Sequence, residues 1–237
     1  MAGTYDDRIV SPLKAEMSQW LKDYPLTVTG ELIRILPDGL IFMTGFLALV
    51  TSSYPFFVLF LTLLESLGAF YLLQMGASNL NITFMRPSRN YQSAVCRNGF
   101  SSPTLSSLSL FGSASQVSAF PSAPLYTISV AAAYLFSSMS SQIPELEALG
   151  PAYSSRFYIS VFSLCILLFV IGSYRMYNEC DGAATVVMSV AVGLLLGTLF
   201  MNQNLAILGP DSINLTGIPL LKSKTVKGES IYVCSSQ

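Results

Sequence analysis

Residues 173–197, SYRMYNECDGAATVVMSVAVGLLLG, decide the class of this protein. Arg175 and Asp181 stand before a run without charge that extends over residues 182–204. As a helix rising about 1.5 Å per residue, this run is long enough to cross the roughly 30 Å hydrocarbon core of a bilayer. The stretch therefore predicts a membrane helix preceded by two charged residues that can form the polar edge of a pocket.

The composition of the whole chain points the same way. Of its 237 residues, 52% are hydrophobic and 11% are charged, and the mean hydropathy is +0.56. Because this is too apolar for a soluble domain, we expect an all-α polytopic protein that is integral to a membrane. The formal net charge of −1 provides no basic surface for nucleic acid. The expected partners are membrane lipids and other protein subunits.

The chain contains no histidine, which excludes imidazole catalysis and histidine-ligated metal sites. Its four cysteines lack the paired spacing of a metal site, so we expect neither a metal nor a cofactor. Cys165 lies in an apolar run and is expected in the core. Cys96 and Cys180 are expected on one face of the membrane. The two cysteines could form a disulfide if that face is lumenal, and the sequence does not decide the pairing.

Residues 1–35 are expected to form an interfacial N-terminal segment. Ser11 can cap a helix whose first position is Pro12, and apolar residues then recur at helical spacing. This amphipathic helix either lies on the membrane surface, with Trp20 at the interface, or packs on the protein's own extramembrane part. Both readings stay open.

The run over residues 39–75 carries Glu65 as its one charge. As a single helix it would be about 55 Å long and would overshoot the hydrocarbon core. Pro55 and the polar residues before it favour a break between two membrane helices, at 36–52 and 55–75. The competing prediction is one span that ends near Glu65. An interfacial position for this carboxylate is favoured over a buried one.

Residues 36–203 are thus predicted to form a bundle of about five transmembrane helices, within a range of four to six. The other three spans are expected at 125–139, 157–173 and 183–203. A long polar insertion, residues 76–123, is expected to cap one face of the bundle.

The last span carries a further packing signal. Gly193 and Gly197 form a small-xxx-small pattern that predicts close contact with a neighbouring helix, with ordinary glycine tolerance in membrane helices as the alternative. Beyond this span, residues 204–237 are expected to form an extramembrane C-terminal tail.

Three short motifs resemble, in chain order, the signatures of the type 2 phosphatidic acid phosphatase (lipid phosphate phosphatase) superfamily. Residues 85–87, Met-Arg-Pro, resemble the end of the first signature. Residues 120–124, Phe-Pro-Ser-Ala-Pro, resemble the second, Pro-Ser-Gly-His. The spacing over residues 174–185 resembles the third, Ser-Arg, five residues, His, three residues, Asp. The resemblance covers roughly residues 55–203.

The resemblance implies a site that holds phosphate or a lipid headgroup, built from Arg86, Ser122, Arg175 and Asp181. Guanidinium groups suit this task because they bind phosphate oxygens bidentately. Asp181 falls on the family's nucleophilic histidine. A carboxylate there would repel a phosphate or neutralise an arginine by salt bridging.

The groups that the family uses for catalysis are replaced at the matching positions. Asn79 occupies the position of the family's lysine. Pro124 occupies the position of the histidine that acts as general acid, and Thr185 that of the orienting aspartate. The resemblance therefore implies an inactive member with no catalytic residues, kept as a structural subunit of a larger membrane assembly. One alternative is a protein that binds a phospholipid headgroup or lipid phosphate. Another is a divergent lipid phosphatase that uses Asp181 as phosphoryl acceptor.

Overall fold

The computed structural model describes residues 7–80, 96–99, 109–111, 120–143 and 151–215. Every regular element in that part of the chain is a helix, which confirms the all-α class. The elements are α1 (Asp7–Thr51), α2 (Tyr54–Leu80), α3 (Ala123–Ser140), α5 (Pro151–Tyr177), α6 (Ala183–Leu208) and the short 3-10 helix η4 (Pro210–Ile213).

Four helical segments in the described residues are long and apolar enough to cross a membrane. They are Val28–Thr51, Tyr54–Asn79, Phe157–Tyr177 and Ala183–Leu208. The prediction of an integral membrane protein is therefore confirmed at this level. α3 is not one of these four segments.

The predicted break before Pro55 is confirmed. α1 ends at Thr51 and α2 begins at Tyr54, and each contributes one of the four apolar spans. Ser52 turns the chain with a positive φ of 47°. Pro55 lies in the first turn of α2, where its missing N–H leaves no intrahelical hydrogen bond unmade. The competing prediction, a single span that ends near Glu65, is wrong because the helix breaks after Thr51 and Glu65 lies inside a second apolar span, Tyr54–Asn79.

The first helix departs from the prediction at both of its boundaries. α1 begins at Asp7 rather than at Pro12, and it continues to Thr51 without a break at residue 35. Its apolar span starts at Val28, eight residues before the expected position 36. Arg34, which was placed in the interfacial segment, and Asp38 are both buried, at 5% and 2% exposure.

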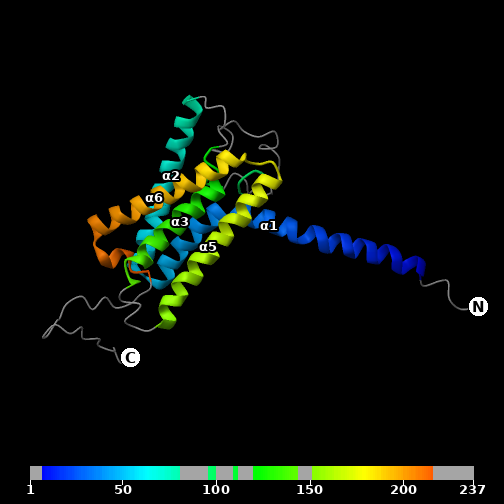
Figure 1. Ribbon diagram of the computed structural model, residues 1–237, viewed down its shortest axis with the longest axis horizontal. Coiled ribbons are helices and arrows are strands. Elements are labelled where there is room, and N and C mark those ends of the chain that lie inside the picture. The colour runs from blue at the N-terminus through cyan, green and yellow to red at the C-terminus, as the bar shows by residue number, and fades with distance from the viewer. Residues whose placement is uncertain (1–6, 81–95, 100–108, 112–119, 144–150, 216–237) are drawn as a thin grey trace, which may run out of the picture.

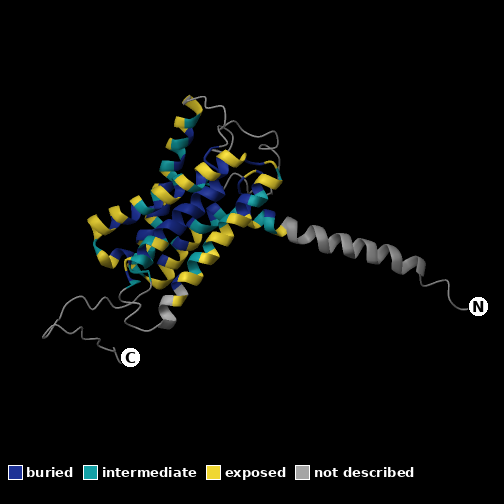
Figure 2. Cartoon of the chain, in the orientation of Figure 1, coloured by how far each residue is buried: buried dark blue, intermediate teal, exposed yellow. Residues whose placement is uncertain are grey.

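α3 forms the centre of the bundle, with the other helices around it (Figure 1). It is buried throughout residues 123–134, and Figure 2 shows its dark blue ribbon inside yellow outer surfaces. α5 lies at the periphery and exposes large apolar side chains such as Phe162 and Phe169. Cys165 is exposed on this helix, so its predicted place in the core is wrong. The reason is that only 17% of the apolar window of α5 is buried.

α3 packs most extensively on α6, and the two helices run parallel. Buried small residues recur every fourth position on α6, at Thr185, Ser189, Gly193 and Gly197. A Cβ at Gly193 would lie 2.6 Å from the Cβ of Ser129. The two glycines thus let the backbones approach closely, in the manner that the small-xxx-small pattern predicts.

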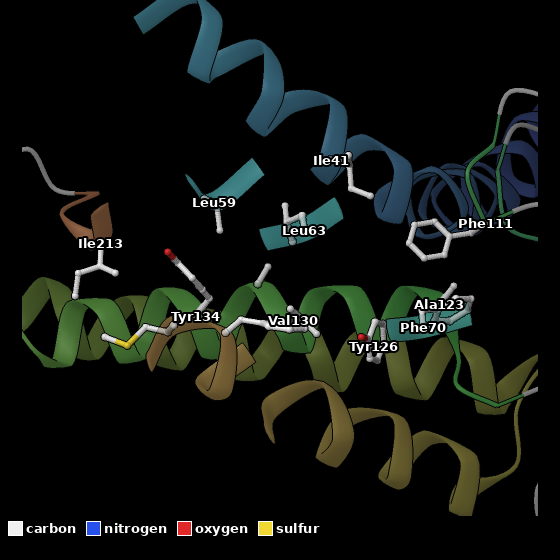
Figure 3. Close-up of a cluster of buried hydrophobic side chains, with 13 residues drawn as sticks. Ile41, Leu59, Leu63, Phe70, Phe111, Ala123, Tyr126, Val130, Tyr134 and Ile213 are labelled. Carbon is white, nitrogen blue, oxygen red and sulfur yellow. The ribbon is translucent and has the colours of Figure 1, made fainter. Parts of the chain in front are cut away.

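Figure 3 shows the main apolar cluster along α3, where Tyr126, Val130 and Tyr134 meet side chains of α1, α2 and η4. Some polar groups inside this core are paired across helices. The amide of Asn204 donates to Thr62 Oγ1 at 2.7 Å and to the Tyr134 hydroxyl at 3.2 Å. These bonds place α2, α3 and α6 at a common level of the bundle.

Candidate functional site

An ion pair between Arg175 and Asp181 forms at the end of the bundle where α5 turns into α6. Arg175 lies in the last turn of α5. The N–H groups of Cys180 and Asp181 donate to the Arg175 carbonyl at 2.8 and 3.4 Å, which folds the chain back on itself. The Arg175 Nε consequently donates to Asp181 Oδ2. The two side chains are only 2% and 0% exposed, so the arginine charge is neutralised in a dry environment.

A disulfide ties the polar insertion to this turn. Cys96 and Cys180 are joined, with their Cα atoms 5.2 Å apart and a sequence separation of 84. Both residues are buried, at 1% and 0% exposure. The segment 96–99 is therefore held beside the Arg175–Asp181 pair.

Arg34 and Asp38, two buried charged residues of α1, also bind the insertion. Arg34 Nε donates to the Arg97 carbonyl at 2.9 Å, and the Gly99 N–H donates to the Arg34 carbonyl at 3.0 Å. Asp38 accepts from Ser109 Oγ at 2.6 Å and from the Leu110 N–H at 3.0 Å. The described parts of the insertion, 96–99 and 109–111, are thereby fixed on this end of the bundle.

Ser122 lies just before the first residue of α3 and bonds to α6. The Ser122 N–H donates to Ser189 Oγ at 2.8 Å, and Ser189 lies about 9 Å along α6 from its first residue. Ser122 Oγ is buried and accepts or donates no hydrogen bond within the described residues. Arg86 lies outside the described residues. Of the four expected site residues, the structure thus brings together Arg175 and Asp181.

The replaced family positions also have defined places. Thr185 is buried at 1% exposure on the face of α6 that meets α3, and Pro124 is buried in the first turn of α3. Asn79 is exposed near the end of α2. In the part of the chain that the structure describes, no group of three acidic or cysteine side chains could hold a metal ion.

Arg34 and Asp38 were not among the residues expected at a site. Three charges, Glu31, Arg34 and Asp38, stand in the span Val28–Thr51, and charges inside a membrane helix are a signal for a functional or structural polar site. The predicted boundary at residue 35 divided this group between an interfacial segment and a span.

A second polar pair lies on the outer surface of the bundle. Glu65 Oε1 accepts a hydrogen bond from Gln203 Nε2 at 3.2 Å, and both residues are exposed. Glu65 stands 11 positions after the start of the 26-residue span Tyr54–Asn79, close to its middle. Gln203 neighbours Asn204, whose amide bonds into the core. Gln203 stands five positions before the end of the span Ala183–Leu208. The pair therefore faces outward within two apolar spans.

A scan against protein-family models finds no family that matches this chain, and searches of curated proteins and of solved structures find no match either.

Proposed function

We propose that this chain is a catalytically inactive member of the lipid phosphate phosphatase superfamily that acts as a structural subunit of a larger membrane assembly. The observation that carries the proposal is the Glu65–Gln203 pair, which is exposed on two apolar spans. A transmembrane helix with a hydrogen-bond donor, supplied by a partner subunit, would cover this pair.

The cost of leaving this pair in lipid favours a partner. A charged side chain at the centre of a membrane helix costs about 2.5–3.5 kcal/mol on insertion scales. The single bond from Gln203 leaves most acceptor sites of the Glu65 carboxylate without a donor among the described residues. Interhelical hydrogen bonds contribute about 0.6–2 kcal/mol each to association in membranes. A partner helix would therefore recover part of the insertion cost.

The state of the ion pair supports the loss of catalysis. Arg175 is neutralised by the chain's own Asp181, and the turn that carries them is tied to the insertion by the disulfide. A phosphate group would have to displace a buried carboxylate to reach the guanidinium. Separating such a pair costs several kcal/mol, because each charge would lose its partner in a low dielectric.

The proposed bundle has five spans, with α3 as the fifth. α1, α2 and α5 all pack on α3, and α3 runs parallel to the apolar helix α6. Its 18 residues rise about 27 Å, close to the hydrocarbon thickness of about 30 Å. Because its neighbours bury it, α3 can be less apolar than helices that face lipid.

The test compares the native mass of the assembly in three forms of the tagged chain, extracted from its own membrane in a mild detergent. The first form is the unchanged chain, and the second combines Glu65→Leu with Gln203→Leu. The third, Thr198→Leu, is a matched control on α6 because the Thr198 hydroxyl donates only to carbonyls of its own helix, at Leu194 and Leu195.

We expect the double variant to migrate at the mass of the isolated chain, while the control remains in the assembly. An unchanged chain that already migrates as an isolated monomer would contradict the proposal, as would a double variant that keeps the full native mass. A thermal unfolding curve of the double variant checks that the bundle itself stays folded.

Two further assays address the alternatives. We expect no phosphate release from phosphatidic acid in detergent micelles above the buffer rate. Release that Asp181→Asn abolishes would instead establish a divergent phosphatase. Retention of phosphatidic acid that is lost on combining Arg86→Ala with Arg175→Ala would favour a headgroup-binding protein.

A further inference from the structure

An apolar groove runs between α1 and α5 on the surface of the bundle. α1 packs on α2 and α3, whereas α5 packs on α3 and α6, so that α1 and α5 leave space between them. The groove has a volume of about 510 Å³, and its walls expose only apolar atoms. Its lining extends from Thr29 to Met43 on α1 and includes Leu167, Val170 and Ile171 on α5.

Both walls of the groove belong to helical segments that are apolar enough to span a membrane. Its α1 wall falls inside the apolar span Val28–Thr51, and its α5 wall falls inside Phe157–Tyr177. Several wall residues are exposed, among them Leu32 at 63% and Met43 at 59%. The groove is therefore open sideways to the membrane, and an occupant must be apolar.

The length of the groove favours an elongated occupant. From Thr29 to Met43 the α1 wall rises 14 positions, or about 21 Å. An occupant in contact with this whole wall must be extended and apolar, as an acyl chain of a membrane lipid is.

Polar groups lie next to the Thr29 end of the groove, outside its lining. The Tyr174 hydroxyl lies against Gly30, where it occupies the place of a Cβ. Arg34 and Glu31 form an ion pair of 3.0 Å on the same part of α1, and the Glu31 side chain is 37% exposed. An apolar groove with hydroxyl and charged groups beyond one end matches the polarity of a phospholipid, whose chain is apolar and whose ester region is polar.

We infer that the groove between α1 and α5 is a binding site for one acyl chain of a membrane glycerophospholipid, with the ester and headgroup region toward Tyr174 and Glu31. The bound lipid fills space that the two helices do not fill themselves, and it gains the dispersion contacts that an empty groove would forfeit. The site is separate from the Glu65–Gln203 surface, so it can exist whether or not the proposed assembly does.

Gly39 offers a way to fill the groove without disturbing the bundle. It belongs to the lining, and a Cβ there would touch only Ile35 Cγ2, at 4.0 Å. A phenylalanine at this position can extend into the groove. Gly68 on α2 is the matched control, because a Cβ there would meet no atom within 4 Å.

The experiment reconstitutes the full chain, Gly39→Phe and Gly68→Phe in nanodiscs of dioleoyl phosphatidylcholine. After transfer to detergent, native mass spectrometry counts the lipids retained by each protein. We expect the unchanged chain and Gly68→Phe to retain one more phosphatidylcholine than Gly39→Phe. Equal unfolding temperatures of the two variants establish that both are folded.

Each other outcome overturns the inference in a recognisable way. Equal lipid counts in all three proteins would show that the groove holds no retained lipid. A retained mass equal to oleic acid would identify a free fatty acid as the occupant. A change in oligomeric mass in Gly39→Phe, with the lipid count unaltered, would identify a protein helix instead.

Discussion

Removing one member of the Arg175–Asp181 pair should destabilise the protein more than removing both. Asp181→Ala leaves a guanidinium that is 2% exposed without its carboxylate. Losing one partner of a buried ion pair costs about 3–5 kcal/mol, because the remaining charge stays desolvated. At about 2–4 °C per kcal/mol for a chain of this size, the unfolding midpoint should fall by roughly 6–20 °C.

Replacing both members by apolar residues should restore the stability. The combination of Arg175→Met with Asp181→Leu removes both charges together with their desolvation cost. Such replacements of buried pairs range from neutral to stabilising by about 1–4 kcal/mol. Here the native pair is also incompletely satisfied, since Asp181 Oδ1 is buried and has no hydrogen-bond partner among the described residues.

The assay is thermal unfolding in detergent, followed by the loss of the monodisperse peak in size-exclusion chromatography. Glu31→Ala is the control, because it also removes a carboxylate from an arginine, but from a pair whose carboxylate is 37% exposed. The Arg34 side chain left behind is 7% exposed, but the Glu31 carboxylate is partly solvated and contributes less to its pair than a buried carboxylate, so the midpoint should fall by less than in Asp181→Ala. Arg34 keeps its bond to the Arg97 carbonyl in this control.

An Asp181→Ala variant that unfolds at the same temperature as Glu31→Ala would refute this account of the pair. A double replacement as unstable as the single one would refute it equally. Either result would mean that the Arg175 charge is hydrated or paired elsewhere.

Three other substitutions test separate contacts. Gly193→Leu should cost at least about 1–3 kcal/mol by overpacking α3 against α6, while Gly68→Leu should cost little; equal SDS-unfolding midpoints would refute this packing. Asp38→Ala removes the acceptor of two hydrogen bonds from the insertion, and hydrogen bonds to a charged group are worth about 1.5–3 kcal/mol each. Trypsin should therefore cleave after Arg97 faster in this variant. An unchanged cleavage rate would mean that Asp38 does not anchor the insertion. Cys96→Ser opens a cross-link over 84 positions and should lower stability by about 4–5 kcal/mol under oxidising conditions, with the difference vanishing in reductant.

Much of the helical organisation could be predicted because its causes are local. Pro55 and the serines before it marked the break between two spans, and the structure has it there. The start of the first span was misplaced for a different reason. The burial of Arg34 and Asp38 depends on segments 63 and 71 positions away, at Arg97 and Ser109, which local pattern does not reveal.

The candidate site likewise has one part that local sequence predicts and one part that depends on how the helices pack. Arg175 and Asp181 are six positions apart across one turn, so their proximity follows from local sequence. The place of Ser122 beside Ser189 depends on how α3 packs along α6, which local sequence does not reveal. Glu65 was recognised as a charge in an apolar run. Its outward direction depends on the rotation of α2 within the bundle, which the nearly uniform apolarity of that helix does not specify.

The burial of α3 bears on the order in which the chain enters the membrane. Translocation machinery selects segments by hydropathy as they emerge, and α3 is not among the four segments apolar enough to span a membrane. Its main packing partner, α6, begins at Ala183 and is synthesised after α5. In the proposed five-span bundle, α3 is therefore expected to settle across the bilayer only after α6 has been synthesised.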